Sequence, residues 1–209
     1  MITKNDGVFF DYAYENMFDH FGKYTIITDS EKELLKYCFR VSYYPKNTFF
    51  LTHSAINKQI GFLVEGSAIN YYTINDKNII NKFYLENSFI GNTHDFITQA
   101  ESDSYIQFCE SSVILEFDYF AYLNIKVNFP KIADIIYGLQ NDELLFYKRR
   151  LHSMQMKNSK DRLRELLLKN HDILNRFKKN HIAAYLGIEH ETLSRMKGKV
   201  VSQRNSNSK

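Results

Sequence analysis

The 209-residue sequence has no tryptophan, two cysteines, two prolines and only eight glycines. Disordered and low-complexity chains are rich in proline and glycine, so their scarcity argues for a folded protein with an apolar core. The apolar runs are too short to span a bilayer, and the first residues lack the basic-then-apolar order of a signal peptide. We therefore expect a cytoplasmic protein with no membrane partner.

The cysteine and histidine content limits the chemistry that the chain can perform. Cys38 and Cys109 lie far apart, and two cysteines cannot build a four-cysteine iron–sulfur or structural zinc site. A cupin-type metal enzyme would need converging histidines and a carboxylate, for which His53, His94 and Glu65 are available without any His-x-His spacing. We expect reduced thiols, no metal, no cofactor and no enzymatic activity.

Charge is divided unevenly along the chain. Residues 151–209 carry 13 Lys or Arg and 5 Asp or Glu, a net charge of +8, whereas residues 1–150 carry 14 and 19, a net charge of −5. A basic carboxyl-terminal part on an acidic body is typical of a nucleic-acid-binding module joined to a sensing or assembly domain. A solvated basic tail is the alternative, and residues 202–209 fit that description.

Between residues 40 and 120, short runs rich in Tyr, Phe, Ile and Val alternate with turn residues. Many short strands at close spacing indicate an antiparallel sandwich or barrel, and we expect a jelly-roll-like β-roll. Ahead of the roll, Asp29 or Ser30 can cap a short helix, whereas residues 1–28 show no clear period. The predicted strands cover residues 48–51, 60–64, 68–74, 79–85, 105–109 and 113–117.

A long helix follows Pro130, a residue that suits the first turn of a helix. Apolar residues then recur at helical spacing, with Gly138 as the weak point in the interior. The helix can pack on the roll or against a second copy of the chain. We favour a homodimer, because helix-turn-helix proteins usually read two half-sites. The residues assigned to the dimer helix are Ile132, Ile135, Ile136, Leu139 and Phe146.

Residues 178–197 are the most informative stretch of the sequence. Apolar residues at 182, 183 and 186 share one helical face, and Gly187 follows where a helix ends in a left-handed residue. Leu193 then anchors a second, largely polar helix. Two short helices joined at a glycine indicate a helix-turn-helix, although any helical hairpin with a glycine cap would look similar.

A β-roll, a long helix and a carboxyl-terminal helix-turn-helix, in this order, resemble the cyclic AMP receptor protein/FNR (Crp/Fnr) family of bacterial transcription regulators. The resemblance extends over residues 25–200 and looks most like the shortened Bacteroidetes-type members. It implies an α+β fold with a double-stranded β-roll of the cyclic-nucleotide-binding type. The segments that carry it are 62–67 (Phe-Leu-Val-Glu-Gly-Ser), 88–91 (Ser-Phe-Ile-Gly), 182–188 and 191–195.

The nucleotide pocket departs from the family pattern. Members that bind cyclic nucleotide carry a Gly-Glu pair for the ribose and an arginine for the phosphate. In this sequence Gly91 is followed by Asn92, and the arginine position falls at about Ser102, beside Asp103. A buried phosphate needs cations or several donors, so we expect a degenerate pocket that does not bind cyclic AMP. An unknown small effector stays possible, and its candidate residues are Phe89, Gly91, Asn92, Ser102, Asp103 and Ser104.

In the family the second helix of the helix-turn-helix enters the major groove of double-stranded DNA. By this resemblance His190, Glu191 and Arg195 match base-contacting positions, and Arg195 can donate twice to a guanine edge. A pair with Glu191 on the same helix is the alternative role for this arginine. Only Val200 and Val201 remain of the usual wing. The residues assigned to phosphate contacts are Ser194, Lys197, Lys199, Lys178 and Lys179.

The sequence thus predicts three parts. Residues 1–128 form a helix and β-roll sensor domain, residues 129–156 form the connecting helix, and residues 157–209 form the DNA-binding domain with a truncated wing. We expect a dimeric transcription regulator that does not respond to cyclic AMP. The alternative is a dimeric ligand-binding or scaffold protein whose helix-turn-helix no longer binds DNA.

Overall fold

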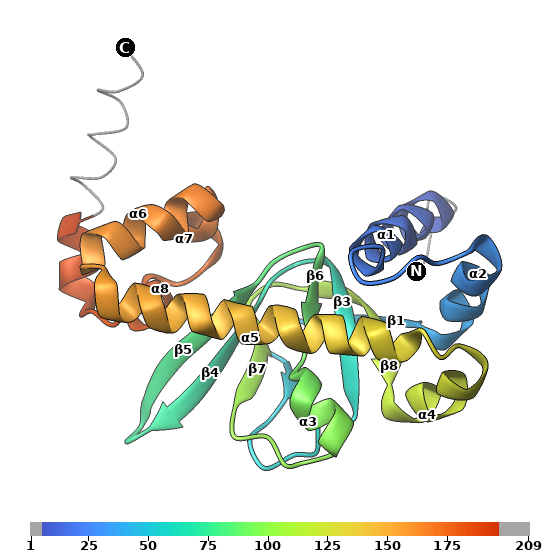
Figure 1. The fold of residues 1–209 in the computed structure, drawn as a ribbon. Helices are drawn as coiled ribbons and strands as arrows, with labels where there is room; N and C mark the ends of the chain where they lie inside the picture. Colours follow the sequence, from blue (N-terminus) through green and yellow to red (C-terminus); the bar gives the residue numbers. More distant parts are fainter. Residues whose placement is uncertain (1–5, 197–209) are drawn as a thin grey trace.

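The computed structural model describes residues 6–196, which form a β-roll flanked by helices (Figure 1). The roll consists of two four-stranded antiparallel sheets, with strand orders β1-β8-β3-β6 and β2-β7-β4-β5. The predicted α+β fold is confirmed. The strands are β1 (Arg40–Tyr44), β2 (Phe49–Leu51), β3 (Gln59–Glu65), β4 (Ala68–Ile74), β5 (Lys77–Tyr84), β6 (Ser88–Ile90), β7 (Tyr105–Phe108) and β8 (Ser112–Asp118).

The helices surround the roll, and the longest of them, α5, runs across the whole molecule (Figure 1). Helices α1, α3, α4 and α7 were not predicted, and α2 is capped by Thr28 rather than by Asp29 or Ser30. Thr28 and Glu31 form a reciprocal capping box, in which each side chain accepts from the other's backbone N–H. The helices are α1 (Asp6–Phe21), α2 (Asp29–Cys38), α3 (Thr93–Thr98), α4 (Tyr119–Asn128), α5 (Ile132–Met156), α6 (Ser159–Lys169), α7 (Ile173–Arg176) and α8 (Lys179–Leu186).

The fold has three apolar clusters, each in a different layer. Between the two sheets, residues such as Leu63, Tyr84 and Phe108 form the centre of the roll. A second cluster joins the first sheet to α1, α2, α4 and α5. A third joins the second sheet, through Ile69 and Ile80, to α6, α7 and α8. The carboxyl-terminal helices are therefore packed directly on the roll.

The apolar face of α5 that was assigned to dimerisation is buried inside this chain. Ile132, Ile135, Ile136 and Leu139 are all 5% exposed or less and belong to the cluster with α1 and α4. Phe146, the fifth residue assigned to the dimer helix, is half-buried beside the Lys82 ammonium. This corrects the residue assignment, because groups already packed in the subunit are not available to a second copy. The sequence showed the stripe but not which neighbour would cover it.

The opposite face of α5 leaves large apolar side chains in solvent. Tyr137, Leu144 and Leu151 are 71%, 65% and 60% exposed and follow one another at seven-residue intervals. On the buried side, Gly138 leaves room for the Tyr24 ring, which would lie only 2.3 Å from a Cβ at that position. The Tyr24 hydroxyl donates to the Asp142 carboxylate of the same helix at 2.7 Å. The glycine that weakens the predicted helix is thus a packing site.

Candidate nucleic-acid interface

The carboxyl-terminal helices have helix-turn-helix geometry. Helix α8 ends at Gly187, whose φ of +63° is left-handed. The N–H groups of Gly187 and Ile188 donate to the carbonyls of Ala184 and Ala183, which closes the end of α8. A second helix covers residues 190–196, and its Leu193 is buried among the helices. The predicted turn and anchor residues have these roles in the structure.

The second helix turns its polar residues outward. His190, Glu191, Ser194 and Arg195 are all exposed, and Arg195 Nη2 donates to Thr192 Oγ1 at 3.2 Å. Its alternative pairing with Glu191 is not formed, because the guanidinium bonds to the threonine instead. At the start of α8, Lys178 and Lys179 are also exposed. Lys197 and Lys199 lie outside the described residues, as does the remainder of the wing.

Aromatic contacts fasten the helix-turn-helix to the β4–β5 hairpin. The Phe83 ring lies 4.5 Å from that of Phe177 and 5.0 Å from that of Tyr185, measured between centroids. The Arg150 guanidinium of α5 lies 3.8 Å from the Tyr185 ring centroid, and its Nη2 donates to the Tyr185 carbonyl at 2.8 Å. The predicted boundary after residue 156 therefore separates segments that share one apolar cluster.

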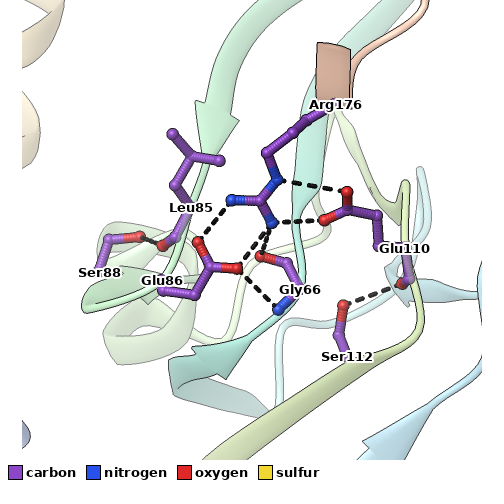
Figure 2. A network of polar contacts seen from close by, with 7 residues as sticks. All are labelled: Gly66, Leu85, Glu86, Ser88, Glu110, Ser112 and Arg176. Atoms are coloured by element: carbon purple, nitrogen blue, oxygen red, sulfur yellow. Dashed lines mark hydrogen bonds and ion pairs between the residues drawn. The ribbon is translucent and has the colours of Figure 1, made fainter. Parts of the chain in front are cut away.

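A polar network reinforces this attachment (Figure 2). The Arg176 guanidinium, at the end of α7, makes two bonds to each of two carboxylates on the roll. Its Nη1 and Nη2 donate to Glu86 at 2.7 and 2.6 Å, and its Nε and Nη2 donate to Glu110 at 3.3 and 2.5 Å. Nη2 also lies 3.0 Å from the Gly66 carbonyl. One arginine thus joins three loops of the roll to the helix-turn-helix.

The ion pairs of this network shift the pKa values of both acids. Hydrogen bonding from Arg176 lowers the pKa of Glu110, against the opposing effect of burial. For Glu86, burial alone would raise the pKa, but bonds from Arg176 and from the Gly66 N–H outweigh it and lower the pKa. Sequence reasoning missed this cluster, because Arg176 is 90 and 66 residues away from its partners. No local motif marks such a contact.

The candidate effector-pocket residues lie around α3 and the start of β7, and most of them serve the fold. The Phe89 ring stacks on Phe21 at 5.2 Å and packs against Phe62. Asn92 caps α3 by accepting from the Asp95 N–H, and Gly91 has a φ of +128° against β3. The remaining three candidates differ in exposure. Ser102 and Ser104 are buried in a hydrogen-bonded network, whereas Asp103 is exposed.

The space beside α3 holds a side chain from α5. Thr93 donates to the Glu143 carboxylate through both its backbone N–H, at 3.2 Å, and its hydroxyl, at 2.6 Å. A cavity of about 170 Å³ remains there, lined in part by Lys82, Gly91 and Glu143. Binding sites for drug-sized ligands have volumes of about 300–1,000 Å³. The predicted effector region is therefore largely filled by the chain's own side chains.

Two further expectations concern metals and membranes. Within residues 6–196, no three His, Cys, Asp or Glu side chains lie close enough to hold a metal ion, so His53, His94 and Glu65 are not assembled as a cupin site. Over the same part of the chain, no helix has both the length and the apolar character needed to cross a membrane.

Both cysteines are free thiols, and burial raises the pKa of Cys109 to about 11.

Comparison with solved structures gives the class of this fold. Three proteins of known structure have similar folds at low identity. They are FixK2 from Bradyrhizobium japonicum (TM-score 0.70, 15% identity, 79% of this chain and 85% of that chain), the c-di-GMP-responsive global regulator CLP from Xanthomonas campestris (0.64, 16%, 82% and 90%) and a CooA mutant from Carboxydothermus hydrogenoformans (0.61, 19%, 81% and 79%). These likenesses, each at under 25% identity, show that the chain shares the fold of these proteins. No protein-family model matches the chain, and no curated protein matches its sequence.

Proposed function

We propose that this protein is a DNA-binding transcription regulator of the Crp/Fnr type. The observation that carries the proposal is the exposed polar face of the helix at 190–196, which is held in a helix-turn-helix by the buried Leu193. Arg195 and Glu191 are exposed on this face, and Lys178 and Lys179 lie at the start of the same unit. A guanidinium suits a guanine edge, and the lysines suit phosphates.

We further propose that the regulator is a homodimer that pairs through the exposed face of α5. Tyr137, Leu144 and Leu151 repeat every seven residues, which is the spacing of a coiled-coil seam. These apolar side chains are removed from solvent only when another helix packs on them. Two copies paired along α5 would present two recognition helices to a duplex, as half-site reading requires.

We also propose that the regulator does not respond to cyclic AMP. The Glu143 carboxylate occupies the donors of Thr93, and the nearby pocket has a volume of only about 170 Å³. A phosphate in this space would meet the Glu143 carboxylate as well as the Lys82 ammonium, and the repulsion from the carboxylate would offset the attraction of that cation. Calorimetric titration should show no heat of binding with cyclic AMP, and micromolar binding would overturn this part of the proposal.

Fluorescence anisotropy with labelled duplexes tests DNA binding directly. The probes are the DNA upstream of the protein's own gene and a random duplex, each in dilute and in physiological salt. We expect binding that weakens steeply with salt, since phosphate contacts dominate nonspecific affinity. Failure to bind either duplex in dilute salt would exclude the regulator and favour the scaffold alternative.

Two variants separate recognition from general electrostatics. Arg195→Ala should cost about 1–3 kcal/mol on the upstream site and less on the random duplex, because it removes a base contact. Lys126→Ala is the matched control, because Lys126 is a cation on α4, at the far end of the molecule from the helix-turn-helix (Figure 1). It should leave both affinities unchanged. Equal losses in the two variants would contradict the assignment.

A further inference from the structure

The junction between α5 and the helix-turn-helix contains a cavity of about 310 Å³. It lies between the second half of α5 and helices α6 and α8. Its volume falls within the range of about 300–1,000 Å³ that is usual for sites of small organic molecules. The apolar part of its lining includes Leu145, Phe146 and Met154 of α5 together with Leu166 and Leu186.

Three arginines also line this cavity, and none of them is paired with a carboxylate of the part of the chain that the structure describes. Arg162 donates to the backbone carbonyls of Lys157 and Leu186, while its Nε is buried and has no acceptor among the described residues. Arg150 likewise donates only to the carbonyls of Ile80 and Tyr185.

The third arginine, Arg149, is exposed and makes no hydrogen bond or ion pair within residues 6–196. Three guanidinium charges therefore border the cavity without a neutralising partner. Arg150 and Arg162 are partly buried, and such cations favour an anion, because carbonyl dipoles satisfy their N–H groups but leave their charge uncompensated.

The two acids that line the cavity already have partners, one of which, Lys169, also lines it. Glu165 accepts from Lys157 and Lys169, each at 3.0 Å, and these bonds lower its pKa to about 2. Asp142 accepts from the Tyr24 hydroxyl at 2.7 Å. Positive charge is therefore in excess at this cavity, beside a sizeable apolar wall.

A second copy of the chain would leave the cavity open. On α5 the cavity is lined by residues 142, 145, 146, 149, 150, 153 and 154. At 100° per residue all of these positions except Met154 lie on the side of the helix away from Tyr137, Leu144 and Leu151. Pairing along the exposed stripe thus covers a different face.

We propose that this cavity binds an amphipathic organic anion, with its carboxylate or phosphate on the arginines and its apolar body against Phe146 and Leu166. Such a ligand would touch α5, α6 and α8 together, and so would fix the helix-turn-helix relative to the long helix. This last consequence rests on the proposed function, whereas the binding itself does not.

The probe is 8-anilinonaphthalene-1-sulfonate, an aromatic anion that becomes fluorescent in apolar sites, titrated into the full chain without DNA. We expect saturable binding of one molecule per chain, weakened by salt and by competing pyrophosphate. Arg149→Glu should weaken it by about tenfold, which corresponds to the loss of one charge-assisted bond. Arg149 has no partner within residues 6–196, so this change should leave folding intact.

Two control variants make the result specific to the cavity. Arg149→Lys keeps the charge and should retain most of the binding. Arg164→Glu reverses an exposed cation on α6 that does not line the cavity, and it should leave binding unchanged. Absence of saturable binding, or equal affinity in the wild type and Arg149→Glu, would overturn the proposal. Because the assay contains no DNA, its outcome is independent of the DNA-binding test.

Discussion

Removal of the Arg176 guanidinium tests how the helix-turn-helix is held on the roll. Arg176→Met keeps the length of the side chain but leaves Glu86 and Glu110 as partly buried carboxylates that repel each other. Breaking a fully buried ion pair costs about 3–5 kcal/mol, and an exposed pair is worth about 0–1 kcal/mol. The Arg176, Glu86 and Glu110 side chains are 24%, 32% and 33% exposed, between these limits. We expect the free energy of unfolding to fall by about 2–3 kcal/mol.

The measurement is urea unfolding followed by circular dichroism, with companion variants. Arg176→Lys keeps one charge but loses the fork that reaches both acids, so it should recover about half of the loss. In a Glu86→Gln/Glu110→Gln background, Arg176→Met should cost much less, because no carboxylate is left unpaired. A change below about 0.5 kcal/mol for Arg176→Met in the wild-type background would refute the reasoning, since ordinary surface substitutions produce effects of that size.

Three further predictions concern packing, acid and assembly. Gly138→Ala should lower the free energy of unfolding by about 1–2 kcal/mol, because the new Cβ would lie 2.3 Å from the Tyr24 ring. This loss should outweigh the higher helix propensity of alanine, and a higher urea midpoint for the variant would contradict the prediction. The free energy of unfolding should fall as the pH drops from about 5 to 3, because Arg176 lowers the pKa of Glu110 in the folded state and protonation of this carboxylate removes the ion pair. In Arg176→Met the same drop in pH should have a smaller effect, because the ion pair is already missing. Leu144→Glu should convert a dimer to a monomer in light scattering, and an unchanged mass would exclude the α5 interface.

Local patterns in the sequence predicted much of the architecture. Each of the six predicted strands lies on an observed one, and the segment 68–74 matches β4 at both ends. Alternating apolar residues and turn residues act over a few neighbours, so they can be read without the fold. The helix-turn-helix was predictable for the same reason, because Gly187 and Leu193 have roles set by their adjacent helices.

Other features depended on partners distant in the chain. The apolar stripe of α5 identified a helix, but only the packed structure showed that Ile135 faces α1 and α4 while Leu144 faces solvent. Similarly, Glu143 and Arg176 looked like ordinary charged residues until folding brought them to Thr93 and Glu86. Periodicity determines which residues share a face, whereas the tertiary contacts determine what that face meets, since those contacts join residues that no local pattern relates.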